Sequence, residues 1–168
     1  MNAIVEDAFA FTRLDKRQGV PLGEVTLREL LRELCSSDPA IPIRDEHGIA
    51  PDAPGIVLAG HGPEPFRGLQ NLIENALTQA QDAEVRMVCD GIKCRIDVMD
   101  RGAGLAGQDR NELVKPFVRG KDAAAWDRVG ARLGLVIVQQ IAARCGGTFA
   151  LLYRAGGGTV ARLSLLRR

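Results

Sequence analysis

Apolar residues recur three and four positions apart in three separate segments of the chain, a spacing typical of amphipathic helices. These segments predict helices over residues 27–35, 65–80 and 135–144. Thr26, with Glu29 three positions later, is a suitable N-cap for the first helix. Gly146 and Gly147 end the last helix. A further helical pattern over 1–17 has no N-cap before it. We therefore expect the tail of a helix from a longer protein, or a short native N-terminal helix.

Two hairpins are predicted, the first of them from the alternation of apolar residues with their neighbours. The first runs over 85–89 and 94–98, with Asp90-Gly91 as its turn, and the second joins 148–153 to 159–166 through 155–158. Shorter apolar runs predict strands near 41–44 and 56–59. Together these elements predict an α/β two-layer sandwich, in which a mixed, mostly antiparallel sheet carries helices on one face.

Residues 101–132 are small, polar and rich in glycine, with little periodicity, and loops of that length in a compact domain are usually functional. Acidic and basic residues nearly balance, with a formal net charge of +1, and long basic runs are missing. This composition argues against a nucleic-acid-binding protein. The sequence contains no membrane-spanning run, so we expect no direct membrane contact from this chain.

The four cysteines, Cys35, Cys89, Cys94 and Cys145, show no C-x-x-C spacing. We expect them to be reduced thiols, largely in the core, as in a reducing compartment. A zinc site is a remote alternative that only two histidines of the chain could assist.

Four motifs carry residues suited to nucleotide chemistry. Asn71 and Asn75 are four apart and share a helix face, where their amide oxygens suit a hard cation such as Mg²⁺. Asp100 ends a strand and can accept a hydrogen bond from an exocyclic amine. Gly102 and Gly104 after it allow a sharp turn and a close ligand approach. The alternatives are two exposed asparagines and an ordinary turn.

The other two motifs surround the long loop. Gly130 and Gly134 come just before an apolar helix, where free N–H groups favour phosphate. Phe117 can clamp the loop onto the domain, and Arg119 can stabilise charge on a transferring phosphoryl group. The alternatives are a glycine-rich loop without a ligand and exposed loop residues. Trp126 in the same loop is a packing candidate.

With all four motifs in order, the chain resembles the catalytic, ATP-binding domain of bacterial sensor histidine kinases, in the Bergerat-fold superfamily. It is most similar to EnvZ-type osmosensor kinases, through Val114–Gly120 and Leu135–Ile141. The resemblance covers about 22–166. It implies that residues 1–17 are the end of the second helix of a dimerisation and phosphoacceptor domain, and that 18–168 form the catalytic domain.

The resemblance also implies the role of each site residue. Asn75 would hold Mg²⁺ between the ATP phosphates, and Asp100 would bind the adenine amino group with help from Gly102 and Gly104. The loop 105–132 would be a lid over ATP. Phe117 would anchor that lid, and Arg119 would contact the γ-phosphate. A phosphate-facing loop would be formed by Gly130, Gly134 and Leu135. Asn71 replaces the water-activating Glu of hydrolytic relatives, and an amide cannot be a general base.

Three positions depart from the family pattern. Thr78 and Gln79 replace a basic residue and an aromatic residue or histidine, so that one phosphate contact and one stacking contact are missing. Arg132 replaces a glycine. Its bulk could block phosphate, or its guanidinium could bind phosphate bidentately.

The implied function is transfer of the γ-phosphoryl group of Mg²⁺·ATP to a histidine on a separate dimerisation domain, with a response regulator downstream. Neither His47 nor His61 has the sequence context of the phosphoacceptor. The parent protein would be an inner-membrane sensor with this domain in the cytoplasm, and the isolated domain a monomer. The alternatives are a degenerate nucleotide-binding module without transfer activity and an anti-sigma-factor-type serine kinase.

Overall fold

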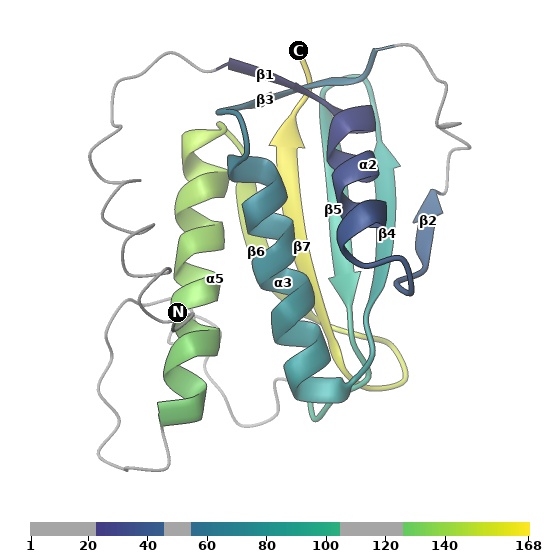
Figure 1. The fold of residues 1–168 in the computed structure, drawn as a ribbon, viewed down its shortest axis with the longest axis vertical. Coiled ribbons are helices and arrows are strands. Elements are labelled where there is room, and N and C mark those ends of the chain that lie inside the picture. Colours follow the sequence, from purple (N-terminus) through teal and green to yellow (C-terminus); the bar gives the residue numbers. More distant parts are fainter. Residues whose placement is uncertain (1–22, 46–54, 105–125) are drawn as a thin grey trace.

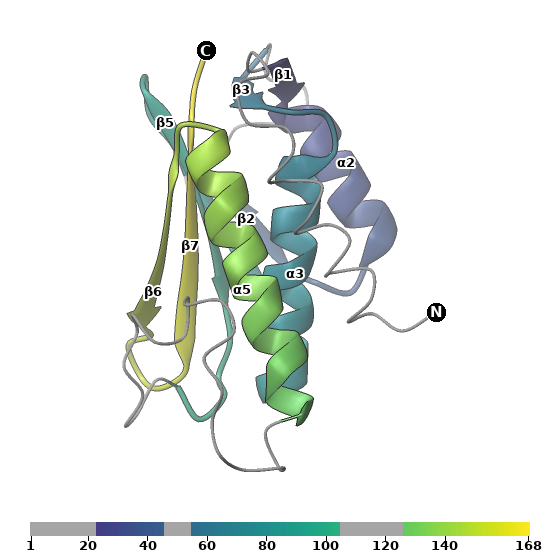
Figure 2. The same ribbon diagram turned by 90° about the vertical axis from the view of Figure 1, so that its left-hand side faces the viewer.

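The computed structural model describes residues 23–45, 55–104 and 126–168 of the chain, with the backbone alone over 126–133. Five strands form a mixed sheet in the order β2-β4-β5-β7-β6, and helices α2, α3 and α5 cover one of its faces (Figure 1). In the view turned by 90° about the vertical axis, the helices form one layer and the sheet forms the other (Figure 2). The predicted two-layer α/β sandwich is confirmed.

Local sequence signals account for two of the helices. α2 (Leu27–Ser37) begins after Thr26, whose hydroxyl accepts the Glu29 N–H at 3.2 Å while the Glu29 carboxylate accepts the Thr26 N–H at 3.1 Å. The predicted cap is therefore a complete capping box. α3 (Glu64–Ala80) has the predicted range to within one residue, and it ends at Gln81, whose backbone is left-handed with φ 56°.

Both predicted hairpins are confirmed. β4 (Glu84–Cys89) pairs antiparallel with β5 (Lys93–Met99), and β6 (Thr148–Tyr153) pairs antiparallel with β7 (Thr159–Leu166). β5 and β7 are also antiparallel neighbours, so that both hairpins join in one sheet. The short strand β2 (Ile43–Asp45) adds to β4 in the parallel direction and makes the sheet mixed.

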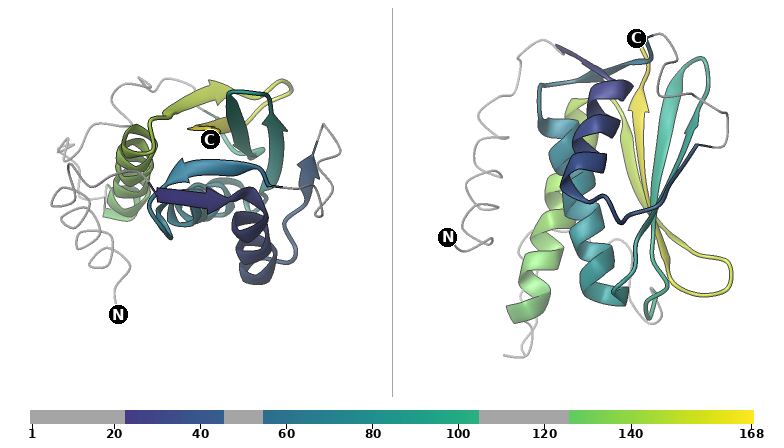
Figure 3. Two further views of the ribbon diagram at one scale, coloured as in Figure 1. Left: turned by 90° about the horizontal axis from the view of Figure 1, so that it is seen from above. Right: turned by 45° about the vertical axis from the view of Figure 1, so that its right-hand side comes forward.

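A separate two-stranded ribbon crosses one end of the sandwich (Figure 3). It pairs β1 (Gly23–Thr26) with β3 (Val57–Gly60) in antiparallel register. β3 lies one residue beyond the predicted strand. β1 was not predicted, because its four residues contain one apolar side chain, Val25, and show no alternation.

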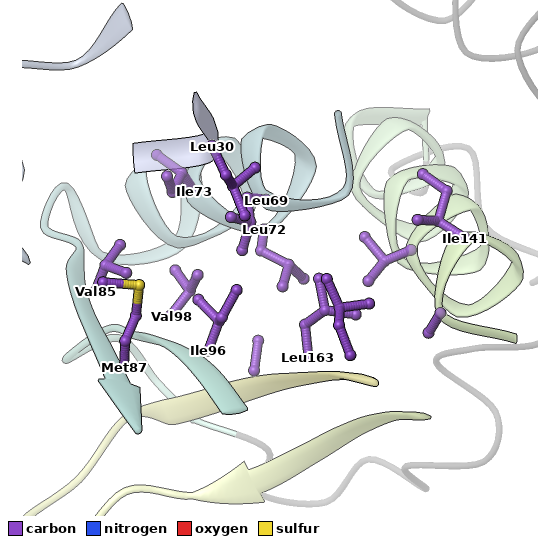
Figure 4. Packing of buried hydrophobic residues seen from close by; sticks show 14 of the residues in the cluster. Leu30, Leu69, Leu72, Ile73, Val85, Met87, Ile96, Val98, Ile141 and Leu163 are labelled. Carbon is purple, nitrogen blue, oxygen red and sulfur yellow. The ribbon is translucent and has the colours of Figure 1, made fainter. Parts of the chain in front are cut away.

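The hydrophobic core fills the space between the helices and the sheet (Figure 4). Leu69, Leu72 and Ile73 of α3 face the inward side chains of the strands, among them Ile96 and Leu163. α3 is thereby held centrally in the helix layer. This placement matters for function, because α3 carries both candidate asparagines.

The expected start of the last helix is wrong. α5 runs from Trp126 to Arg144, nine residues longer at its N-terminus than predicted. Trp126 therefore lies in a helix and not in a loop. Residues 131–133 (Ala-Arg-Leu) are good helix formers, and each single glycine costs a helix only about 1 kcal/mol relative to alanine. Packing of α5 along α3 offsets that cost.

The expectation of four reduced cysteines is also wrong. Cys89 and Cys94 occupy directly opposed positions at the end of β4 and the start of β5, and they form a disulfide. The alternation of the hairpin turns both side chains into the core at the same register, which brings the two sulfur atoms together. Cys35 is free and exposed, and Cys145 is free and buried.

Within the described ranges no His, Cys, Asp or Glu cluster could hold a metal ion, and none of the helices there is long and apolar enough to cross a membrane.

Candidate functional site

The candidate residues that the structure describes gather around the middle and the C-terminal part of α3, whose C-terminal end lies toward the bottom of Figure 1. The turn that follows β5 approaches α3 from one side, since a Cβ built on Gly102 would lie 3.0 Å from the Gln79 carbonyl oxygen. α5 approaches from the other side, where a Cβ on Gly134 would lie 3.7 Å from the Asn71 Cβ. The structure therefore brings the Asn, Asp-Gly and second glycine motifs to one place.

Backbone hydrogen bonds fix Asp100 at the end of β5. Its side chain is buried, and its Oδ1 accepts the N–H groups of Gly102 at 2.8 Å and Thr159 at 3.2 Å. The Asp100 N–H in turn donates to the Thr159 carbonyl oxygen at 3.0 Å. Both side-chain bonds fall on one oxygen, so the carboxylate is oriented before any ligand arrives and its Oδ2 can meet a ligand amine.

Glycines allow this arrangement. Gly104 has φ +70° and Gly158 has φ +100°, both in the region that disfavours residues with a Cβ. A Cβ on Gly158 would overlap the Asp100 carbonyl oxygen, so the turn between β6 and β7 can lie this close to Asp100 only with glycine at 158. Gly102 and Gly104 were predicted to belong to the site, whereas Gly158 was predicted only as part of the turn between the last two strands.

Asn71 and Asn75 lie one turn apart on α3, and both are half-buried. The Asn71 Nδ2 is buried and has no hydrogen-bond partner in the described part of the chain. An unsatisfied buried amide is costly, and an anionic oxygen of a ligand would satisfy it. Their half-buried positions do not fit the alternative of two exposed asparagines.

The second glycine motif differs most from expectation. Gly130 and Gly134 lie inside α5 and do not precede it, so the expected free N–H groups belong to helix backbone. Leu135 packs into the core. Arg132 is within the same helix, although its side chain lies outside the described part. Phe117 and Arg119 fall within 105–125, which the structure does not describe.

Thr78 and Gln79, the two residues of α3 that differ from the family pattern, do not contribute to the site. The Thr78 hydroxyl donates to the Glu74 carbonyl oxygen at 2.7 Å, so it is bound to its own helix. Gln79 is exposed. Neither side chain therefore supplies the missing cation or aromatic ring.

At the other end of the helix layer, an ion pair joins α3 to α5. Arg144 Nε lies 3.2 Å from Glu64 Oε2, and both side chains are nearly buried. Burial, and then the charge of Glu64, raise the pKa of the adjacent Cys145 thiol to about 11. Cys145 is therefore a protonated residue of the core at neutral pH.

Comparison with known proteins agrees with this geometry. Residues 60–168 match the family described as histidine kinase-, DNA gyrase B-, and HSP90-like ATPase. The chain is 28% identical over 163 residues to the sensor protein RstB of Escherichia coli K12, covering 88% of this chain and 35% of RstB. It is 26% identical over 167 residues to the sensor-like histidine kinase SenX3 of Mycobacterium tuberculosis H37Rv, covering 96% of this chain and 41% of SenX3.

A similar fold occurs in the full-length structure of ShkA in complex with AMPPNP, with a TM-score of 0.68 and 24% identity, covering 99% of this chain and 36% of that one. The chain thus spans well under half of the curated relatives it matches. Because the family match extends over well more than half of the chain, it identifies the domain without reference to the parent protein. The chain belongs to the family of histidine kinase-, DNA gyrase B-, and HSP90-like ATPases.

Proposed function

We propose that this domain binds Mg²⁺·ATP beside the middle and the C-terminal part of α3 and passes the γ-phosphoryl group to a histidine on a separate helical dimerisation domain. A response regulator would then receive the phosphoryl group. The parent would be a membrane-anchored sensor, with residues 1–17 as the end of its second dimerisation helix and residues 18–168 as its catalytic domain.

The observation that carries the proposal is the preoriented Asp100 carboxylate. Two N–H groups hold Oδ1, so Oδ2 can accept a hydrogen bond from the adenine amino group without reorganisation. Guanine carries a carbonyl oxygen at the same ring position, and that oxygen would face the carboxylate without a shared proton. The site should therefore prefer ATP to GTP.

The residues on α3 fit the phosphate end of the nucleotide. The Asn71 amide has a buried donor without a partner in the described part of the chain, and Asn75 lies one turn further along. Mg²⁺ is commonly held by few protein groups together with substrate phosphates, and Asn75 would supply the protein oxygen. The bound ion would neutralise phosphate charge. Phe117 and Arg119 would close over the nucleotide, while Gly130, Arg132 and Gly134 would lie on the phosphate side.

Asn71 supports transfer over hydrolysis. A water-activating base at this position of α3 would need a carboxylate or an imidazole, and an amide cannot take the proton. Water is then a poor nucleophile in this site. A partner histidine, which brings its own lone pair, is favoured.

Calorimetric titration with AMPPNP, with and without Mg²⁺, tests the binding step. We expect Mg²⁺ to strengthen binding to the wild-type domain, and Asn75→Ala to remove most of that difference. Gln70→Ala is the matched control, since it deletes an amide from the same helix at a half-buried position outside the proposed site. Asp100→Asn should weaken ATP binding and reduce the preference for ATP over GTP. Undiminished affinity and selectivity in Asp100→Asn would contradict the assigned role.

A second experiment tests transfer. The domain is incubated with γ-labelled ATP and the histidine-bearing dimerisation domain of the same parent protein, and label on the partner is measured. We expect transfer to the histidine and none after its substitution. Binding without transfer would favour a nucleotide-sensing module instead. That alternative is favoured by Thr78, whose hydroxyl is bound to its own helix where the family pattern has a cation.

A further inference from the structure

We propose that Asp82 is a positioning residue for nucleotide binding, because its carboxylate holds the turn after Asp100 against the end of α3. The inference rests on the proposed nucleotide site. None of the motifs discussed above includes Asp82.

The geometry begins at the end of α3. Gln81 adopts a left-handed backbone with φ 56°, and its N–H donates to the Leu77 carbonyl oxygen at 2.9 Å. The reversal leaves the next residue, Asp82, beside the turn that follows β5. There Asp82 Oδ1 accepts the Arg101 N–H at 3.0 Å, across 19 residues of sequence.

This bond acts on the atoms that orient Asp100. Arg101 lies between Asp100 and Gly102, and the Gly102 N–H is one of the two donors to Asp100 Oδ1. The Arg101 N–H belongs to the peptide group that joins Asp100 to Arg101. If this group rotates, the next peptide group is displaced with it, and its Gly102 N–H turns away from the Asp100 carboxylate. Asp82 prevents that rotation. It also ties the adenine end of the site to the helix that carries Asn71 and Asn75.

Helix energetics do not explain an acidic residue here. Asp82 follows the C-terminus of α3, where the helix dipole disfavours negative charge, and the last turn of α3 has no basic residue to compensate. Removing the charge should therefore leave α3 as stable as before or slightly more stable. What Asp82 does contribute is an acceptor for the Arg101 N–H, which a neutral amide oxygen could also supply.

The test compares Asp82→Ala with Asp82→Asn, which keeps an acceptor oxygen at the same place. Asp90→Ala is the matched control. Asp90 Oδ1 also accepts two turn N–H groups, from Ile92 and Lys93 at 2.8 Å each, but in the β4–β5 turn at the other end of β5. Each variant is measured for hydrogen exchange at the Arg101 amide, for stability in urea and for AMPPNP affinity.

We expect Asp82→Ala to speed exchange at Arg101 and to weaken AMPPNP binding about fivefold to tenfold, the worth of one net hydrogen bond. The AMPPNP affinity of Asp82→Asn should stay within about twofold of the wild-type affinity. Asp90→Ala should lose stability with unchanged affinity.

Wild-type affinity in Asp82→Ala, together with lost protection at Arg101, would overturn the role of Asp82 alone. Equal weakening in Asp82→Asn and Asp82→Ala would also overturn it, because charge and not position would then be responsible. A wild-type domain that binds no nucleotide would overturn the proposed function and this role with it. Hydrogen exchange at Arg101 would still report on the bond itself.

Discussion

Gly158 gives the sharpest test of how the fold builds the candidate site. It has φ +100°, and a Cβ at this position would overlap the Asp100 carbonyl oxygen and lie 2.9 Å from the Arg101 Cα. Both contacts are to backbone at the end of β5, which cannot swing aside as a flexible side chain could. Gly158→Ala must therefore push the β6–β7 turn away from Asp100.

The cost has two parts. Alanine in this disfavoured backbone region costs about 1–3 kcal/mol. Relieving the overlap separates β7 from the end of β5 and breaks two hydrogen bonds between Asp100 and Thr159, at 3.0 and 3.2 Å. Each is worth about 1 kcal/mol net. We expect Gly158→Ala to lower the free energy of unfolding by about 3–5 kcal/mol. The loss of the Thr159 donor to Asp100 Oδ1 should weaken AMPPNP binding about fivefold or more.

Gly156→Ala separates the backbone cost of alanine at positive φ from the cost of the overlap with Asp100. Gly156 lies in the same turn with φ +85°, but a Cβ there would meet nothing within 4 Å. It bears only the backbone cost and should leave nucleotide affinity unchanged. Urea unfolding and calorimetric titration of both variants make the comparison. If Gly158→Ala is no less stable than Gly156→Ala and binds AMPPNP as wild type does, the close approach of Gly158 to Asp100 does not support the site.

Thr26→Ala should cost about 1 kcal/mol in urea unfolding, because α2 loses its cap. Ser36→Ala, which removes a hydroxyl bonded to an exposed carbonyl of the same helix, should cost almost nothing. Thiol titration at pH 8 should find Cys35 alone in the native oxidised protein and Cys145 as well after unfolding, and reduction of the disulfide should lower stability by about 2 kcal/mol for so short a loop. Stability should fall as pH rises from 9.0 towards about 11, because the Cys145 thiol ionises in the unfolded chain before it does in the native one, and Cys145→Ala should flatten that slope. Gly134→Ala should stabilise the ligand-free domain by about 0.5–1 kcal/mol, since its Cβ would make ordinary contacts with Asn71.

The sequence predicted best the elements whose signals are local. The capping box of α2 and the Asp90 turn of the β4–β5 hairpin each involve residues at most three apart. Alternation in the hairpins likewise assigns each side chain to one face of the sheet. For these parts, predicted and observed ranges agree to within one or two residues.

The long-range pairings could not be predicted in the same way. Alternation shows which residues face the core but not which strands are neighbours, so the pairing of β1 with β3 could not be predicted. The bonds from Thr159 to Asp100 and from Arg101 to Asp82 join residues 59 and 19 positions apart. No spacing rule connects such residues. The disulfide could not be predicted either, because only the register of the hairpin shows that Cys89 and Cys94 are directly opposed.

The start of α5 shows how one residue type can carry two signals. Glycines at 130 and 134 suggested a phosphate-facing loop, yet both lie in the helix, and a Cβ on Gly134 would make only ordinary contacts with Asn71. A phosphate contact through the N–H groups of this segment would require the first part of α5 to unwind, and nucleotide would then have to supply that free energy. In that case Gly134→Ala weakens AMPPNP binding by the same free energy by which it stabilises the ligand-free helix, which corresponds to about twofold to fivefold in affinity. If affinity instead stays constant while stability rises, the helix persists in the complex, and Asn71 and Asp100 bind the nucleotide beside an intact α5.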